Sequence, residues 1–305
     1  MEGELWSVLY PLVEAEDKRR PRRPRVVYND AIILSVALWA VLHDRPICWA
    51  CRRENWGTSL PWLALPAPGT MSLRLRTLSV QQLLEQVFLR LLNVTAVGGF
   101  CLCRRIDSKP MVVGGFSKDR DARRGYATGG TCRGYKLFAC WGTSPIMPEA
   151  VVFGPMSESD QAGAMHLIDR LEHLHGGAGT AGGYLLMDAT HDTNPLHDHA
   201  GSRGFQPVTP RKAPGTGLGH REHSPHRLRS IELLEGAPAG LNDFGPALYA
   251  QRGQVERDFG NAGSFGCGLQ PLPNFVRRPR RVVLWVIGKL IINGLRICQK
   301  HGLTA

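Results

Sequence analysis

The stretch "GGYLLMDAT", residues 182–190, decides the fold class. Leu185, Leu186 and Met187 are apolar, and Asp188 follows them directly. A short apolar run bounded by turn residues predicts a buried strand. A carboxylate in such surroundings is costly unless it is paired or binds a metal. Because sites in α/β folds gather at the carboxyl ends of strands, the stretch predicts an α/β fold with a site at Asp188.

The segments around this strand alternate between strand and helix patterns. Further strands are expected at residues 100–115 (ending near Asp107), 133–142, 148–156 and 205–212. Helices are expected at residues 159–175 with Ser159 as N-cap, at residues 194–204, from Pro246, and at the apolar C-terminal end. Residues 215–230 are expected to form a loop. Three strands, a helix, a strand, a helix, a strand and closing helices predict hairpin strands that lead into crossovers.

The first part of the chain has a different character. An apolar helix is expected from Asp30 and an amphipathic one over residues 79–92, capped by Ser79. The change of pattern near Gly98 predicts a helical N-terminal region at residues 1–95 and an α/β domain at residues 96–305.

The composition favours a nucleic-acid partner. Lys and Arg number 37 against 26 Asp and Glu, a net charge of +11, with basic runs at Lys18–Arg25 and Arg277–Arg281. The longest apolar run, Ala31–Leu42, is shorter than the ~20 residues a bilayer needs, and the acidic start does not resemble a signal peptide. The eight Cys form no disulfide framework, and Cys48 and Cys51 are expected to be free thiols. These features predict a reduced, cytoplasmic protein outside the membrane.

Three carboxylates form a candidate metal site. Asp107 and Asp188 are both expected at strand ends, and a helix from Pro246 can supply Glu256. Such a set suits Mg2+, and two ions about 3.5–4 Å apart can promote phosphodiester chemistry. Each carboxylate also has a structural reading. Asp107 could cap the following turn, Asp188 could be an ordinary strand-end residue, and Glu256 could pair with Arg252.

The stretch "YAQRGQVERDFG", residues 249–260, places Tyr249, Arg252 and Glu256 on one helical face, although Gly253 weakens the helix. With the segments around the two Asp residues, this motif resembles the DDE transposases of bacterial insertion sequences. That group carries a Tyr, two residues, an Arg, three residues and a Glu, followed after six more residues by a Lys. The resemblance covers roughly residues 28–300. The chain departs from the pattern at Gly263, where the family has Lys.

The resemblance implies a ribonuclease-H-like catalytic domain, a mixed sheet flanked by helices, behind a helical N-terminal DNA-binding region. Asp107, Asp188 and Glu256 would bind two Mg2+, with Mn2+ as a substitute. Tyr249 and Arg252 would hold phosphates of the transposon end. Further backbone contacts are expected from Lys118, Arg123, Arg124, Arg133 and Lys136, each of which could instead be a solvated charge.

The implied activity is cleavage of double-stranded DNA at the terminal inverted repeats of the element. Water would attack the phosphodiester, and the resulting 3′-OH would attack target DNA. Action at two ends implies a homodimer on DNA, in the cytoplasm and associated with the nucleoid. Two alternatives stay open: a decayed transposase that only binds DNA, which Gly263 favours, and a nuclease on the same fold.

Overall fold

The computed structural model describes residues 2–21, 26–59, 61–62, 64–95, 101–127, 129–142, 147–176, 182–218, 222–236, 243–264, 269 and 271–302. The chain folds into two compact units. The first, here the helical unit, contains residues 1–95, 113–121 and 262–305, and the second, the sheet unit, contains residues 96–112 and 122–261.

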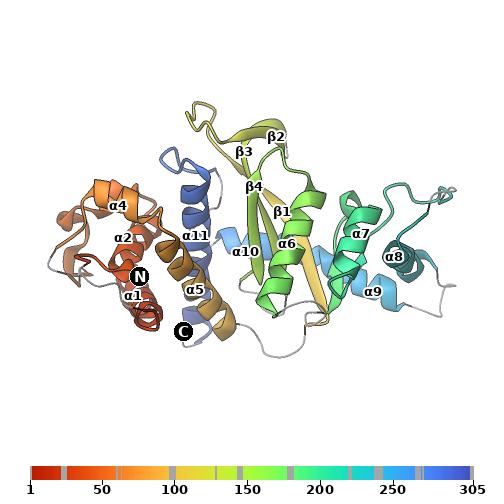
Figure 1. Ribbon diagram of the computed structural model, residues 1–305, viewed down its shortest axis with the longest axis horizontal. Helices are drawn as coiled ribbons and strands as arrows, with labels where there is room; N and C mark the ends of the chain where they lie inside the picture. The colour runs from red at the N-terminus through yellow and green to blue at the C-terminus, as the bar shows by residue number, and fades with distance from the viewer. Residues whose placement is uncertain are drawn as a thin grey trace. The chain divides into compact units, whose positions relative to one another are not determined.

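A mixed sheet forms the centre of the sheet unit (Figure 1). Its strands are β1 (Cys103–Val112), β2 (Arg123–Ala127), β3 (Gly130–Trp141), β4 (Ala150–Pro155), β5 (Gly183–Leu186) and β6 (Phe205–Val208). The strand order is β2–β3–β1–β5–β6, and β4 also pairs with β3. β3 is antiparallel to β1, β2 and β4, whereas β1, β5 and β6 are parallel. Hairpin strands that lead into parallel crossovers are confirmed, although four strands rather than the expected three precede the first helix of this unit.

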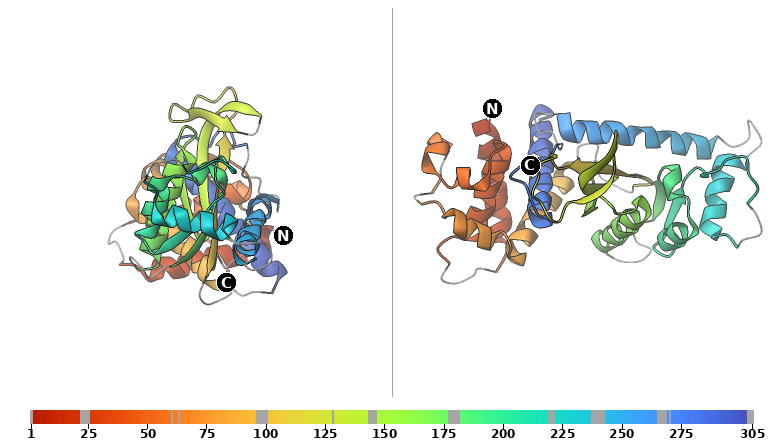
Figure 2. Two further views of the ribbon diagram at one scale, coloured as in Figure 1. Left: turned by 90° about the vertical axis from the view of Figure 1, so that its right-hand side faces the viewer. Right: turned by 90° about the horizontal axis from the view of Figure 1, so that it is seen from above.

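Helices cover both faces of this sheet (Figure 2). They are α6 (Asp160–Leu174), α7 (Asn194–Gly201), α8 (Pro225–Glu235), α9 (Phe244–Ala250) and α10 (Gln254–Ser264), and a 3-10 turn, η4 (Gln251–Gly253), joins the last two. α6 packs on the face that carries Phe138 and Leu185. The opposite face carries Leu186, which packs with Leu248 of α9.

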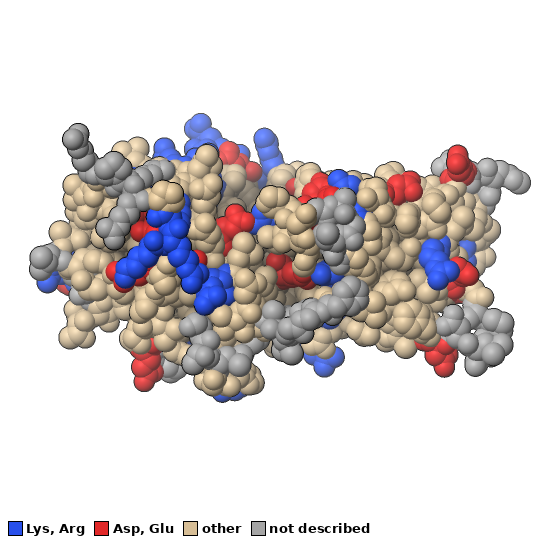
Figure 3. All heavy atoms as spheres, turned by 60° about the horizontal axis from the view of Figure 1, so that its bottom comes forward, with Lys and Arg blue, Asp and Glu red and all other residues tan. Residues whose placement is uncertain are grey.

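The helical unit contains α1 (Glu2–Lys18), α2 (Asp30–Leu42), α3 (Ile47–Ala50), α4 (Pro68–Arg74), α5 (Leu78–Thr95) and α11 (Pro279–Lys300). α11 packs against α5, α2 and α1. Trp6, Trp39 and Trp56 form an aromatic cluster with ring centroids 4.7–5.4 Å apart. On the face drawn in Figure 3, Lys and Arg side chains gather over these helices at the left, whereas elsewhere they alternate with Asp and Glu.

α11 is, within the described ranges, the one helix long and apolar enough to cross a membrane, but 72% of its apolar window is buried. The core helix of a globular unit has the same length and composition, and Lys289 in its middle is fully buried and paired with Asp44. α11 lies within the range 96–305 expected to form one domain, yet it packs with the first 95 residues. The compact units therefore have other bounds than the domains expected from the sequence.

Several local expectations were wrong. Ser79 does not cap α5, because the helix begins at Leu78 and the Ser79 hydroxyl bonds the Asp30 carboxylate. Residues 225–230 are helical rather than part of a loop, since Ser224 caps α8 with Pro225 in its first turn. β2 is a strand that the sequence analysis did not predict.

Candidate active site

Asp107 lies on β1, and Asp188 follows the end of β5, the neighbouring parallel strand. β1 and β5 are in register with Arg105 opposite Leu186. Asp107 and Asp188 each come two residues after this pair. Both side chains belong to the face of the sheet that α9 covers, because side chains alternate along a strand. Asp107 is not at a strand end as expected. β1 continues to Val112 because β3 pairs with it beyond the end of β5.

Asp188 is held ionised by local hydrogen bonds. It caps a short 3-10 turn, η3 (Ala189–His191), where its Oδ1 accepts from the Thr190 N–H at 3.0 Å, from the Thr190 hydroxyl and from His191 Nδ1 at 2.7 Å. Burial alone would raise the pKa of Asp188, but the bonds from His191 and Thr190 outweigh it and lower this pKa. A deprotonated carboxylate is the form that a hard cation requires.

Asp107 has the opposite electrostatic environment. Burial raises the pKa of Asp107, and the neighbouring charge of Asp188 raises it further, whereas the Ser108 N–H and Arg252 act against the shift. Its Oδ1 accepts from the Ser108 N–H at 2.8 Å, and its Oδ2 accepts from the Arg252 guanidinium at 3.2 Å. Two carboxylates close enough to repel each other are stabilised by an intervening cation, and here Arg252 provides that charge for one of them.

Tyr249 and Arg252 lie next to the two Asp residues. Tyr249 packs against the cluster around Leu186. Burial raises the pKa of Tyr249, Asp188 and Asp107 add to the shift, and Arg252 opposes it. The Arg252 side chain is 21% exposed, and its buried Nε–H has no hydrogen-bond partner in the described part of the chain. The 3-10 turn η4 falls at Gly253, the residue expected to weaken the helix. Tyr249 and Arg252, two members of the sequence motif, thus lie beside Asp107 and Asp188.

Glu256 is not part of this group. It lies on α10, exposed, about one turn beyond Arg252. Among the described residues it takes part in no hydrogen bond or ion pair, so the alternative pairing with Arg252 is not formed either. Asp258, two residues further, is fully buried and pairs with Arg105 of β1 at 3.0 Å. Sequence reasoning missed this anchor of α10, although the spacing Val255, Asp258, Phe259 marks the buried face of the helix.

A family model for the transposase DDE domain matches residues 103–292, well over half of the chain. The chain belongs to this family. The comparisons with curated proteins and with solved structures gave no match. The matched range begins at the first residue of β1 and contains Asp107, Asp188 and Glu256.

The basic residues expected to bind DNA differ in their environments in this DDE transposase. Arg123 and Arg124 of β2 are exposed, and Arg124 pairs directly across the hairpin with Arg133 of β3. Lys136 is 13% exposed, and its ammonium group donates to the Glu158 carbonyl at 2.9 Å and to Asp160 at 3.0 Å. Lys118 is exposed and belongs to the helical unit.

Asp192 has a structural role beside the Asp188 turn. Only 3% of its side chain is exposed, and it accepts from Arg227 Nε at 2.6 Å and Nη2 at 2.9 Å and from the Lys212 N–H at 3.2 Å. These bonds tie η3 to α8 and to the chain after β6. The ionised Arg227 outweighs burial and lowers the pKa of Asp192.

The donor set fits a divalent cation in part. Asp107 and Asp188 present carboxylate oxygens on one face of the sheet, and within the described ranges no residue donates to Asp188 Oδ2. The described residues hold no group of three or more His, Cys, Asp or Glu able to bind a metal together. The expected group of three carboxylates is not formed, because the exposed Glu256 side chain lies away from Asp107 and Asp188. Two of the three expected ligands are therefore brought together, and the third lies about one helical turn beyond Arg252, which contacts Asp107.

Proposed function

We propose that this protein is an insertion-sequence transposase that cleaves DNA at the terminal inverted repeats of its own element and joins the freed ends to target DNA. The observation that carries this proposal is the placement of Asp107 on β1 and of Asp188 just after the parallel strand β5, with Arg252 bonded to Asp107. A ribonuclease-H-like fold is supported by the mixed sheet, in which the antiparallel strands β3 and β4 precede the crossovers to β5 and β6.

Asp107 and Asp188 would hold Mg2+ or Mn2+, with Glu256 as the third ligand. Members of this family generally use divalent metals, and such ions activate an attacking oxygen and stabilise a leaving one when bound. The residues of the chain do the positioning. Thr190 and His191 fix the Asp188 carboxylate and keep it ionised. The Arg105–Asp258 pair holds α10 against β1, which fixes the height of Glu256 along the sheet.

Arg252 and Tyr249 would bind phosphates of the element end. The planar guanidinium can make two hydrogen bonds to one phosphate, and Arg252 has a buried Nε–H that lacks a partner among the described residues. A phosphate beside Arg252 would lie next to the carboxylate pair. The proposed reaction begins with water, whose oxygen bonds to phosphorus while the 3′ oxygen leaves and takes up a proton. The oxygen of the 3′-OH so formed then bonds to a phosphorus of target DNA and gives up its proton, while the target's 3′ oxygen leaves and takes up a proton.

The β2–β3 hairpin supports contacts with the DNA backbone. Arg124 and Arg133 lie directly opposite each other, which places two positive charges side by side on the hairpin. Arg123 and Lys118 are exposed and can also reach phosphates. Lys136 has the weakest support, because its ammonium already bonds Glu158 and Asp160. We further propose that residues 1–95 recognise the repeats and that two copies act together on the two ends.

Cleavage of a linear DNA that carries the flanking element ends, by the purified protein with Mg2+, tests this function. Nicks at the element termini with 3′-OH ends, absent from DNA with scrambled ends, are the expected result. Cleavage that ignores the ends would identify a nuclease on the same fold. Binding to the ends without cleavage would identify a decayed transposase, the reading that the exposed Glu256 and Gly263 favour.

A further inference from the structure

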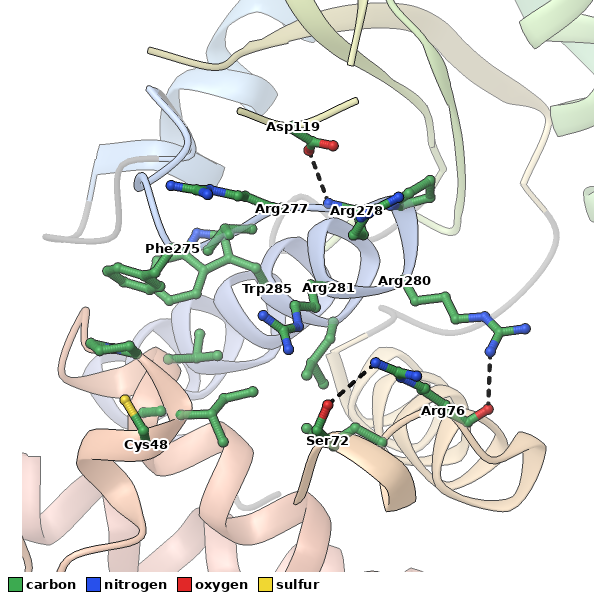
Figure 4. A pocket seen from close by; sticks show the side chains of 18 of the residues that line it. Cys48, Ser72, Arg76, Asp119, Phe275, Arg277, Arg278, Arg280, Arg281 and Trp285 are labelled. Atoms are coloured by element: carbon green, nitrogen blue, oxygen red, sulfur yellow. Dashed lines mark hydrogen bonds between the residues drawn. The ribbon is translucent and has the colours of Figure 1, made fainter. Parts of the chain in front are cut away.

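The helical unit contains a large pocket at the start of α11. Its volume is about 1130 Å3, and its walls come from the end of α2, from α3, from α4, from residues 118–121 and from residues 275–285. Figure 4 shows side chains from these segments turned toward one space. Ligand pockets usually measure ~300–1,000 Å3, so this one is large enough for a drug-sized or nucleotide-sized group.

The rim of the pocket is strongly cationic. The four arginines between residues 277 and 281 line it together with Arg45, Arg76 and Lys118, against only two acids, Asp119 and Asp121. Both acids are engaged by Arg278: Asp119 accepts from its backbone N–H at 2.9 Å, and Asp121 from its guanidinium at 3.1 Å. The Arg281 and Lys118 side chains form no hydrogen bond or ion pair within the described residues. The pocket therefore keeps a net positive charge that its own acids do not balance.

The floor of the pocket is apolar and holds one unpaired donor. Val41, Val276 and Leu284 are buried there, and Trp285 is 4% exposed. The Trp285 ring lies edge to face with Phe275 at 5.5 Å, and its buried Nε1–H has no hydrogen-bond partner in the part of the chain that is described. A buried donor without a partner is costly, and an acceptor on a ligand would satisfy it.

We propose that this pocket binds nucleotides of a single DNA strand. Phosphates would bond Arg281 and its cationic neighbours, a base would lie against Phe275 and the apolar floor, and an acceptor of the ligand would take the Trp285 Nε1–H. An intact duplex fits less well, because its bases are stacked and paired and only its phosphates face outward. A cationic groove lined by aromatic side chains is a common means of binding unpaired strands. The choice of DNA rests on the proposed function, whereas the charge and the unpaired donor do not.

The test is fluorescence anisotropy with the full-length protein and a labelled single strand of about ten nucleotides, beside the matching duplex. Arg281→Ala should weaken strand binding roughly tenfold, the effect of one charge-assisted hydrogen bond. It should also reduce the slope of log affinity against log salt by about 0.7. Trp285→Phe keeps an aromatic ring but removes the indole N–H donor, and should weaken binding roughly threefold to tenfold. Arg90→Ala, a half-exposed charge of the same unit outside the pocket, is the matched control and should bind as wild type.

Three results would overturn the proposal: wild-type affinity in both pocket variants, an equal loss with the duplex, or an equal loss in Arg90→Ala. If a mononucleotide displaces the labelled strand as well as an unlabelled strand does, at equal concentrations of phosphate groups, the pocket would be assigned to a free nucleotide instead. The strand assay needs no cleavage, so it is repeated with Asp188→Asn, which should bind the strand as wild type. Failure of the carboxylate site and failure of the pocket therefore give different results.

Discussion

Replacing the two Asp residues should change stability in opposite directions. Asp188 Oδ1 accepts three hydrogen bonds, from the Thr190 N–H, the Thr190 hydroxyl and His191. Asp188→Asn keeps an acceptor oxygen but loses the charge, which is worth about 1 kcal/mol for each bond. Since the Asp188 side chain is 35% exposed, solvent screening reduces the sum to about 1–2 kcal/mol. That loss corresponds to a fall of about 2–6 °C in Tm.

Asp107→Asn should leave the free energy of unfolding unchanged or raise it by up to about 1 kcal/mol. Burial and Asp188 disfavour the ionised Asp107, and raise its pKa above 3.8. A neutral amide removes that repulsion while it can still accept one of the two bonds. The gain should exist above the folded-state pKa of Asp107 and disappear as the pH falls through it.

The loss of unfolding free energy in Asp188→Asn has the opposite origin, because the folded-state pKa of Asp188 lies below 3.8. The stabilisation by ionised Asp188 is complete above the unfolded-state pKa and is lost as the pH falls toward the folded-state value. The difference in unfolding free energy between Asp188→Asn and wild type should therefore be constant from about pH 5 upward and vanish in strong acid. Thermal unfolding of both variants and wild type across this pH range measures the two effects.

Cleavage of element-end DNA should fall about a thousandfold or more in both variants, since the loss of a metal ligand removes several kcal/mol of transition-state stabilisation. Asp198→Asn is the control, because Asp198 is an exposed carboxylate on α7 of the same unit. Asp192→Asn is unsuitable as a control, because it would break the buried bonds to Arg227 and confuse stability with activity. If Asp107→Asn destabilised the protein as much as Asp188→Asn, the inferred repulsion between the two carboxylates would be refuted.

Three further predictions concern the rest of the molecule. Asp258→Ala should lower the free energy of unfolding by about 3 kcal/mol, because it leaves Arg105, whose side chain is 12% exposed, without its carboxylate partner. Denaturant unfolding beside the exposed Asp243→Ala measures this, and equal curves would exclude an anchoring role. Deletion of residues 1–95 alone should expose the apolar face of α11, so that the remaining fragment binds a hydrophobic dye. Deletion of both 1–95 and 265–305 should give a fragment that does not bind the dye. A 96–305 fragment that fails to bind the dye would contradict the division into units. Log affinity for element-end DNA should fall linearly with log salt, as the +11 charge implies, and a flat dependence would remove nucleic acid as the main partner.

Much of the sheet unit was predictable because its signals are local. The apolar run before Asp188, the Ser159 cap and the strand patterns each depend on a few neighbouring residues, and the structure has β5, α6 and the strands β1, β3, β4 and β6 where the patterns indicated them. β2 was missed because Gly125 and exposed charges dilute its pattern, so it forms only through pairing with β3. The loop expected at residues 215–230 was wrong because Ser224 and Pro225 start a helix within a stretch rich in His and Arg.

The candidate site was predictable in its members and less so in its geometry. The motif spacing indicated Tyr249 and Arg252, and the structure places both beside Asp107 and Asp188. Position along a strand depends on pairing with distant segments, so the sequence could not show that β1 continues past Asp107. Nor could it show that Asp258 rather than Glu256 faces β1, because that depends on how α10 is rotated against the sheet.

The bond between Arg252 and Asp107 links DNA binding to the carboxylate pair. Arg252 supplies the positive charge that two neighbouring carboxylates need, and its Nη2 lies 3.2 Å from Asp107 Oδ2. If Arg252 turns to a DNA phosphate, Asp107 loses this partner while its repulsion from Asp188 remains. The pair would then bind a cation more strongly, because the competing guanidinium has left. By reciprocity, a cation on the pair would free Arg252 for phosphate, so metal and element-end DNA should each increase the affinity for the other. Arg252→Ala should abolish this coupling while leaving Asp107 free for metal, which equilibrium binding of DNA with and without Mg2+ measures.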